Sequence, residues 1–281
     1  MSGTAYREGS WTAPHSGHLF AYRAWQPSIP ARALVVIIHG FGEHGGRYRP
    51  VGQALAEQGI CVVAPDLWAH GRSGGSRGDL GDLGEAVSEL VACTEQVLLP
   101  LSGQQTYTIY GHSFGGLAAI VWLLDHQAHV RRAVIQSPLL EVAFQIPAWK
   151  RIGASVLARC WPSCALSMDL DTTRLSHDPA VIQAYRDDPL VHNRMSARTY
   201  HSLLESRDRA LRDAARIQVP TLLLDAGDDQ IISTAWAARW FDRLVCPKRR
   251  ITFPESYHEL HHESVRTEVL GLVTDWALEL T

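Results

Sequence analysis

The sequence has few cysteines, and their spacing argues against disulfides and metal sites. Their number is odd and no two form a C-x-x-C pair. The five cysteines are Cys61, Cys93, Cys160, Cys164 and Cys246. We therefore expect neither a disulfide framework nor a cysteine-based zinc site. Unpaired thiols fit a reducing compartment, so the predicted location is the cytoplasm.

Long apolar runs and an excess of one charge are also missing. The most apolar run, Ala33 to His39, is far too short to cross a bilayer and is typical of a buried strand. The N-terminal stretch MSGTAYREGSWTAP is polar and lacks the apolar region of a secretory signal. With 26 basic and 29 acidic residues the net charge is −3, which leaves no electrostatic footprint for nucleic acid. We expect no membrane span, no signal peptide and no nucleic-acid partner.

What the sequence does contain is an alternation of strand and helix patterns. Apolar, β-rich runs predict strands over residues 34–38, 61–64, 106–110, 133–136, 221–224 and 250–253. Helical spacing occupies residues 49–59, 87–99, 117–124 and 263–280. This alternation predicts an α/β fold, with a mostly parallel sheet and helices on both faces.

One segment, residues 139–215, breaks this rhythm. It contains helical pieces and the prolines at 147, 162, 179 and 189, but no convincing strand. We therefore predict a core made of residues 1–138 and 216–281 and a helical insertion at 139–215. The chain of 281 residues is long enough for such a domain with an insertion.

The strand pattern TYTIY runs directly into GHSFGG, residues 111–116, and then into a helix pattern. This is G-x-S-x-G in a strand–turn–helix context, which predicts Ser113 on a sharp, strained turn with its hydroxyl exposed. Gly111 and Gly115 lack a Cβ and would let strand and helix approach closely. The free amides of the helix start favour developing negative charge. Ser113 is therefore the candidate nucleophile; the alternative is a glycine-rich loop with a capping serine.

A serine nucleophile needs a base and an acid that orients the base. In this architecture they follow the serine in the order acid, then histidine. The strand at 221–224 ends in DAGDDQII, and the strand at 250–253 ends in PESYHELHH. The acid candidates are Asp225, Asp228 and Asp229, and His258 is the candidate base.

The same C-terminal stretch contains H-E-x-x-H, from His258 to His262, which is a zinc-peptidase pattern. In such enzymes the motif lies within a helix, so that both histidines face one metal. Here a strand ends just before the motif, at Pro254, so the helix begins at Glu259 or later and His258 lies in the loop. We expect no metal. A zinc peptidase, which a chelator would inhibit, is the alternative.

Taken together, several motifs resemble the monoacylglycerol lipase and lysophospholipase branch of the α/β-hydrolase family. They are HGFGEHGGRY (39–48), GHSFGG, GDDQII and SYHELHHE, with SRGD (76–79) and AYRDDPLV (184–191). The resemblance implies an α/β-hydrolase fold in which residues 139–215 form a helical cap. The family's acid precedes a polar residue and two aliphatics, which selects Asp229. Ala69 departs from the family, which usually has glycine there.

The resemblance also implies roles around the triad of Ser113, Asp229 and His258. The backbone amides of Phe41 and Phe114 would form the oxyanion hole. Residues for the glycerol end of the ester would be Glu43, Arg47, Tyr185 and His261. The alternative for these is a structural salt link of Glu43 with Arg47 or with His261. No cofactor is implied.

The expected function is hydrolysis of monoacylglycerols through an acyl-enzyme on Ser113. Alternatives are a lysophospholipase or general short-chain esterase with the same triad, and a catalytically silent fold that binds a ligand. In the cap, Trp149, Ile152, Val156 and Cys160 recur at helical spacing. That face is a candidate for lining an acyl tunnel, for transient contact with a membrane surface, or for packing onto the core. The motifs fix neither acyl-chain length nor oligomeric state.

Overall fold

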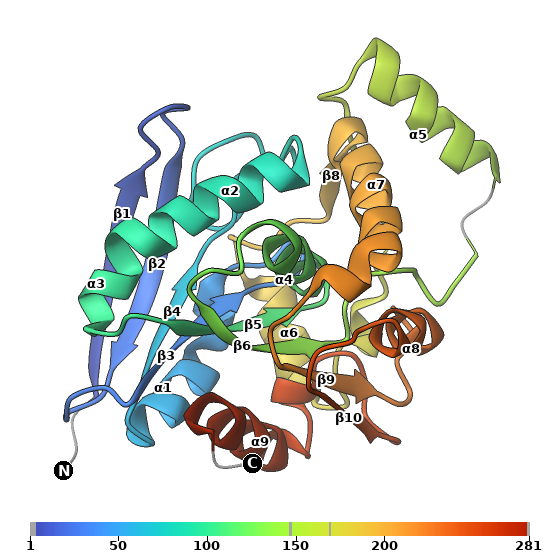
Figure 1. Cartoon of the computed structure of the whole chain (residues 1–281). Coiled ribbons are helices and arrows are strands. Elements are labelled where there is room, and N and C mark those ends of the chain that lie inside the picture. The colour runs from blue at the N-terminus through green and yellow to red at the C-terminus, as the bar shows by residue number, and fades with distance from the viewer. Residues whose placement is uncertain (1–3, 146–147, 169, 280–281) are drawn as a thin grey trace.

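A computed structural model describes residues 4–145, 148–168 and 170–279, and its centre is an eight-stranded sheet (Figure 1). In spatial order the strands are β1 (Ala5–Thr12), β2 (Leu19–Gln26), β4 (Ile60–Pro65), β3 (Ala33–Ile38), β5 (Tyr107–His112), β6 (Val130–Gln136), β9 (Thr221–Ala226) and β10 (Lys248–Phe253). The pairs β1–β2 and β2–β4 are antiparallel, and all other neighbours are parallel. The sheet is therefore mostly parallel, as predicted.

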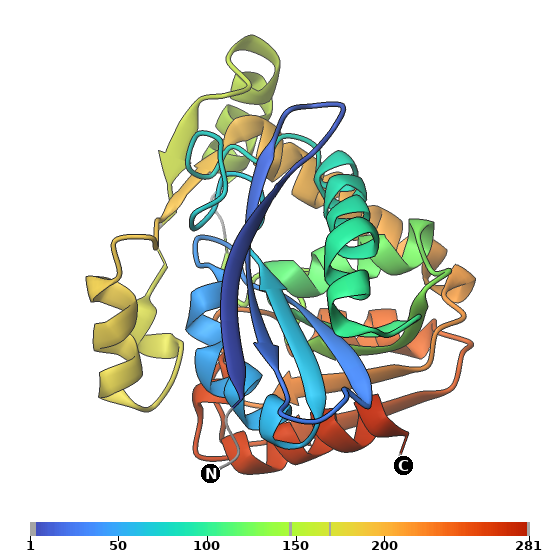
Figure 2. The same ribbon diagram turned by 90° about the vertical axis from the view of Figure 1, so that its left-hand side faces the viewer.

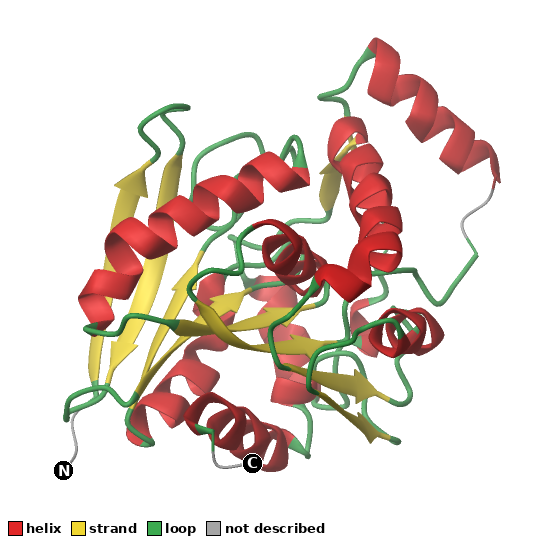
Figure 3. Ribbon diagram, viewed as in Figure 1, coloured by secondary structure: helices red, strands yellow, loops and turns green. Residues whose placement is uncertain are grey.

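Helices cover both faces of this sheet (Figure 3). One face carries α1 (Arg49–Glu57) and α9 (Arg266–Leu278); the other carries α2 (Leu83–Cys93), α4 (Phe114–Asp125), α7 (Ala197–Asp213) and α8 (Thr234–Asp242). Successive residues of β3 point to opposite faces, so Val35 packs towards α1 and α9 whereas Val36 packs towards α2 and α4. Because both faces are covered, β4 and β5 are buried at every residue.

Most predicted elements are confirmed, with differences at the N-terminus and after residue 93. The strands β1 and β2 were not predicted, because β1 is an exposed edge strand without an apolar pattern. The helix predicted over 87–99 is divided into α2, a π-helical turn η2 (Thr94–Leu98) and the short α3 (Leu99–Ser102). The helix α1 ends where predicted, since Gly59 adopts a φ of 82° just after it.

The insertion between β6 and β9 is mainly helical, as predicted. It contains η3 (Thr172–Arg174), α5 (Ala148–Cys160), α6 (Pro179–Asp187) and α7, followed by the 3₁₀ turn η4 (Ala214–Arg216). The prediction that it has no strand is wrong, since β7 (Ala165–Ser167) pairs with β8 (Arg194–Ser196). Strands of three residues are too short to give a recognisable alternation. Pro147, one of the prolines that marked the segment, lies outside the described residues.

The helix α5 stands away from the sheet, while α6 lies along a different side of the molecule (Figure 2). The side chains of Trp149 and Val156 are 71% and 53% exposed, and Cys160 is exposed too. Their exposure does not favour the packing alternative for Val156 and Cys160; the side chain of Ile152 lies outside the described part. Among the helices of the described residues, none combines the length and apolar character needed to cross a membrane.

Candidate active site

Ser113 occupies the turn between β5 and α4, with φ 56° and ψ −119°. Positive φ is unfavourable for a residue with a Cβ, so the turn is strained as the motif predicts. The residues two positions before and after it, Gly111 and Gly115, must be glycines. A Cβ at Gly115 would lie 2.1 Å from the carbonyl oxygen of Ile38, and a Cβ at Gly111 would lie 2.4 Å from that of Gly115. This close packing of strand and helix presents the serine at the carboxyl edge of the sheet.

The two predicted oxyanion donors lie on either side of this serine. Phe114 is the first residue of α4, so its amide has no acceptor within the helix. Phe41 follows β3, and its ring meets that of Phe114 edge-on with centroids 5.2 Å apart. The amide of Gly40 donates to Glu43 Oε1 at 2.6 Å, which fixes the chain just before Phe41. A Cβ placed on Gly40 would be 3.5 Å from the Cβ of Ser113, so this loop borders the nucleophile.

The predicted acid and base are bonded to each other. His258 Nδ1 lies 2.7 Å from Asp229 Oδ2, and both side chains are buried. The other Asp229 oxygen accepts the amides of Ile231 and Ile232 at 3.0 and 2.9 Å. Burial alone would raise the pKa of Asp229, but the charge of His258 and the hydrogen bonds that Asp229 accepts outweigh burial and lower this pKa. Burial would lower the pKa of His258, but the carboxylate of Asp229 outweighs this and raises it.

The competing acids have other partners. Asp225, in β9, accepts a 2.5 Å hydrogen bond from Arg250. Asp228 is exposed. Asp66, also at the end of a strand, pairs with Arg23 at 2.6 Å. Among these carboxylates in the described chain, only that of Asp229 is bonded to His258, so the geometry favours Asp229 over the other candidates.

Ser113 and His258 line one cavity of about 490 Å³. Its walls are mostly apolar and come largely from the insertion. They include Leu139, Leu140, Met168, Met195, Leu203 and Leu204. Trp149, Val156 and Cys160 are not among the described lining residues, so the acyl-tunnel expectation is not met for these three side chains. A cavity of this size beside a nucleophile suits a small, largely apolar ligand.

The residues predicted for the glycerol end form a buried charged cluster. Arg47 donates to Glu43 at 2.5 Å and to both oxygens of Glu259 at 2.6 and 2.8 Å. Its guanidinium lies 4.7 Å from the ring centre of Tyr185. Although burial alone would raise the pKa values of Glu43 and Glu259, the Arg47 charge holds both well below their usual range. The salt link of Glu43 with Arg47, weighed as an alternative, is therefore present.

Only part of this predicted set reaches the cavity. Glu43 and Tyr185 line it, together with Glu259, whereas Arg47 and His261 are not among its described lining residues. The ring of His261 stacks on Tyr48 with centroids 4.8 Å apart, behind the cavity wall. Neither Arg47 nor His261 is therefore placed to touch a ligand in the described cavity directly in this conformation.

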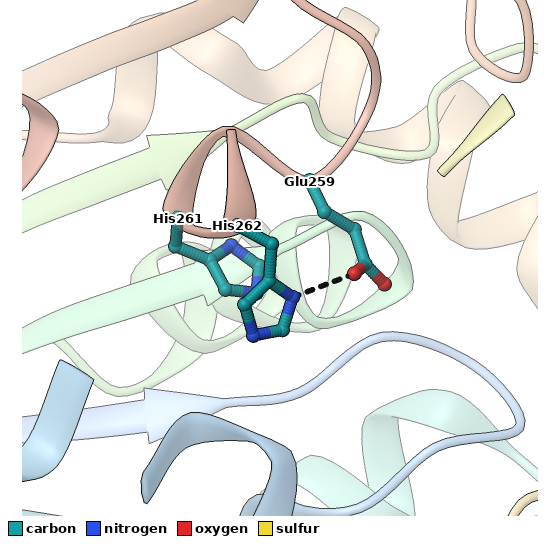
Figure 4. Close-up of side chains that lie close together, drawn as sticks. All are labelled: Glu259, His261 and His262. Carbon is teal, nitrogen blue, oxygen red and sulfur yellow. Dashed lines mark hydrogen bonds and ion pairs between the residues drawn. The ribbon is translucent and has the colours of Figure 1, made fainter. Parts of the chain in front are cut away.

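The H-E-x-x-H stretch does not form a metalloprotease helix. His258 precedes the 3₁₀ turn η5 (Leu260–His262), and α9 begins only at Arg266. Ligand atoms of Glu259, His261 and His262 lie within 4.8 Å of one another (Figure 4). However, His262 Nδ1 is bonded to Glu259 at 2.7 Å, and both Glu259 oxygens already receive hydrogen bonds from Arg47. A divalent cation would have to compete with that guanidinium for the carboxylate.

Two participating residues were missed in the sequence. In the sequence Glu259 stands out only as part of the H-E-x-x-H pattern, because its bonds to Arg47 join residues far apart in the chain. Gln136 ends β6, where its carbonyl accepts the amide of Ser113 at 3.0 Å and its side chain lies 3.1 Å from His261. The sequence feature that could have identified Gln136 is its position at the end of a predicted strand, which in the fold lies next to β5.

Comparison with known proteins agrees with this geometry. Residues 29–265 match the family model described as serine aminopeptidase, S33. The monoacylglycerol lipase of Mycolicibacterium smegmatis is 30% identical over 267 residues, which cover 92% of this chain and 93% of that protein. An uncharacterised abhydrolase domain-containing protein of Dictyostelium discoideum is 34% identical over 92% of this chain, which spans only 27% of that protein's length.

A solved structure extends the likeness to three dimensions. The crystal structure of Paleococcus ferrophilus monoacylglycerol lipase matches with a TM-score of 0.82 and 29% identity, over 99% of this chain and 100% of that one. The chain therefore belongs to the serine aminopeptidase S33 family of α/β-hydrolase enzymes, in the branch that includes these monoacylglycerol lipases.

Proposed function

We propose that this protein hydrolyses monoacylglycerols through an acyl-enzyme formed on Ser113. The observation that carries the proposal is the hydrogen-bonded pair of His258 and Asp229 at the same apolar cavity as a serine on a strained turn. The names of the relatives support the substrate class.

In the proposed first step, Ser113 Oγ attacks the ester carbonyl while His258 Nε2 takes its proton. Asp229 accepts the Nδ1 hydrogen, which holds the ring in the tautomer with a free Nε2 and stabilises the imidazolium. The amides of Phe41 and Phe114 are proposed to hold the oxyanion. One such donor contributes about 3–4 kcal/mol of transition-state stabilisation.

The alcohol then leaves with the proton that His258 carries, which completes the first half-reaction and leaves the acyl group on Ser113. A water molecule then attacks the acyl-enzyme, and His258 acts as base again. Every proton is moved by side chains of this cavity, and the mechanism requires no cofactor.

We further propose that residues 139–215 act as a cap on a core made of residues 1–138 and 216–281. The cavity walls support this division. Apolar side chains from the beginning and from the later part of the segment, such as Leu140 and Leu203, line the cavity that Ser113 also lines. Such a cap would hold the acyl chain while the core supplies the reacting groups.

Charge at the head-group end favours a neutral glycerol over a phosphate. Glu43 and Glu259 line the cavity and share the guanidinium of Arg47, so these three side chains carry one net negative charge. Carboxylate oxygens accept hydrogen bonds from a diol, whereas they repel a phosphodiester in a site shielded from water. A lysophospholipase is therefore the second candidate.

Matched substrates distinguish these two activities. We expect kcat/KM for 1-oleoylglycerol to exceed that for oleoyl lysophosphatidylglycerol by at least about tenfold, the size of effect expected from an unpaired polar contact. Equal or faster cleavage of the phospholipid would favour the second candidate. The Ser113→Ala protein is the control for background hydrolysis.

We also propose that α5 and Trp161, the residue that follows it, make transient contact with a lipid surface. Trp149, Val156 and Trp161 are 71%, 53% and 63% exposed, and a monoacylglycerol substrate is itself a membrane component. We expect Trp161→Ala to weaken co-sedimentation with phosphatidylcholine vesicles while hydrolysis of the water-soluble p-nitrophenyl acetate is unchanged. Equal sedimentation of both proteins would contradict membrane contact through this residue.

A further inference from the structure

The segment formed by α6 and the loop after it, residues 179–193, lies against the loop that carries Phe41. We call these the α6 arm and the oxyanion loop, the latter being residues 40–48. They belong to parts of the sequence more than a hundred positions apart, and the arm is part of the insertion. Two hydrogen bonds join them, one between side chains and one between backbones.

The side-chain contact is between His44 and Asp188. His44 Nε2 lies 2.8 Å from Asp188 Oδ2, and the two side chains are 6% and 25% exposed. His44 Nδ1 accepts the amide of Gly46, so the ring proton is on Nε2 and is donated to the carboxylate. The second oxygen of Asp188 accepts the amide of Leu190. Both residues are thus fixed at two points each.

The backbone contact is between His192 and Gly42. The His192 amide donates to the Gly42 carbonyl at 2.8 Å. Gly42 has a φ of 77°, and a Cβ placed there would lie 2.2 Å from the carbonyl oxygen of His192. The arm and the loop are therefore in direct backbone contact, one residue away from Phe41.

The other side of Phe41 is held by the core. The Gly40 amide donates to Glu43 at 2.6 Å, and His39 Nδ1 donates to the Gly40 carbonyl at 2.7 Å. The peptide that carries the Phe41 amide is thus fixed by core side chains before it and by the insertion after it. Its position depends on both parts of the molecule.

We propose that Asp188 is a positioning residue for the oxyanion hole, acting through its hydrogen bond to His44. The inference rests on the proposed function, since it concerns the hole assigned there to Phe41 and Phe114. Releasing this bond removes one of the two hydrogen bonds that hold the oxyanion loop to the insertion, and the Phe41 amide then points less accurately at the developing negative charge. The loss should appear in the transition state and not in substrate binding.

The variants Asp188→Ala, His44→Ala and their combination test this, with Asp187→Ala as matched control. Asp187 is the neighbouring acid and the last residue of α6; it is exposed, and the described partner of its side chain is Gln183, four residues earlier. We expect Asp188→Ala to lower kcat by about tenfold with KM within about twofold of wild type. A trifluoromethyl ketone that mimics the tetrahedral adduct should lose affinity by a similar factor. Asp187→Ala should match the wild type.

The double variant separates positioning from two unrelated defects. If the two side chains act through one bond, the kcat of the combined variant should be no lower than that of the less active single variant. Losses that multiply, a change in KM alone, or an Asp188→Ala protein equal to Asp187→Ala would overturn the inference. Should Asp188→Ala fail to fold, Asp188→Asn, which keeps an acceptor for His44, replaces it and is expected to lose kcat by a smaller factor.

The same experiment keeps this inference apart from the proposed function. A wild-type protein without Ser113-dependent hydrolysis would refute the proposed function itself. An active wild type with an unaffected Asp188→Ala variant would refute only the role of Asp188.

Discussion

Arg47 and Glu259, which are 212 positions apart in the chain, form a two-pronged ion pair with nitrogen–oxygen distances of 2.6 and 2.8 Å. Arg47 is 8% exposed and Glu259 is 2% exposed. Glu43 shares the same guanidinium. The pair joins the oxyanion loop to the loop that carries His258, so two of the loops around the reacting groups depend on one buried cation.

Removing that cation should destabilise the fold. We expect Arg47→Met to lower the free energy of unfolding by about 3–5 kcal/mol, because two buried carboxylates lose the cation that pairs with both of them. Arg131 provides a matched control, since it also pairs with both oxygens of a glutamate, Glu279, but is 56% exposed. Arg131→Met should cost less than about 1 kcal/mol. Denaturant unfolding measures both, and similar losses would show that the buried pair is no stronger than a surface one.

The pH dependence of hydrolysis should follow His258. The base must be neutral to accept a proton, and Asp229 raises the pKa of His258 above its usual value of 6.5. Activity should therefore fall as the pH is lowered, with a midpoint above 6.5. In Asp229→Asn the carboxylate charge is gone, so the midpoint should move to lower pH, and the maximal rate should fall by about 10³–10⁴-fold.

The measurement is kcat/KM across pH for the wild type and Asp229→Asn, with Asp225→Asn as a comparison. Asp225 is buried nearby but pairs with Arg250. If the midpoint moved in Asp225→Asn and not in Asp229→Asn, the acid that acts on His258 would be Asp225, and the assignment to Asp229 would be wrong.

Two glycine-to-alanine changes should have opposite effects on stability. At Gly115 a Cβ would lie 2.1 Å from a backbone oxygen, so Gly115→Ala should destabilise the protein by more than about 2 kcal/mol and reduce activity. Gly271 lies within the exposed part of α9, and no described atom lies within 4 Å of an added Cβ. Gly271→Ala should stabilise by about 0.5–1 kcal/mol. Thermal unfolding checks both; a tolerated Gly115→Ala would contradict the close packing at the serine turn.

Chelation should leave activity unchanged. Glu259, His261 and His262 lie close together, but Arg47 already occupies both oxygens of Glu259. We expect the same hydrolysis rate before and after dialysis against EDTA, and no gain on adding zinc. A rate that is lost with EDTA and restored by zinc would revive the metallopeptidase alternative.

The sheet and the reacting groups could be predicted because their signals are local. Ser113, Asp229 and His258 each follow a recognisable strand, and parallel strands bring their carboxyl ends to one edge. The β1–β2 hairpin could not be predicted, because an exposed edge strand has no apolar pattern. The two short strands in the insertion were missed for lack of length.

Contacts between distant segments could not be predicted from the sequence. Arg47 with Glu259 and His44 with Asp188 each join charged or polar residues from separate loops, and nothing in either local pattern names the partner. The motif resemblance located Glu43, Arg47, Tyr185 and His261, yet only the fold separates those that line the cavity from those behind it.

The central claim is that Ser113 is an activated nucleophile, and the most direct test is covalent labelling with a fluorophosphonate probe. Intact mass should show one adduct on the wild type, with or without EDTA, and none on Ser113→Ala; peptide mapping should place the adduct on Ser113. A well-folded wild type that stays unlabelled, or a Ser113→Ala protein that is labelled equally, would contradict the account and favour a silent binding fold or a different nucleophile.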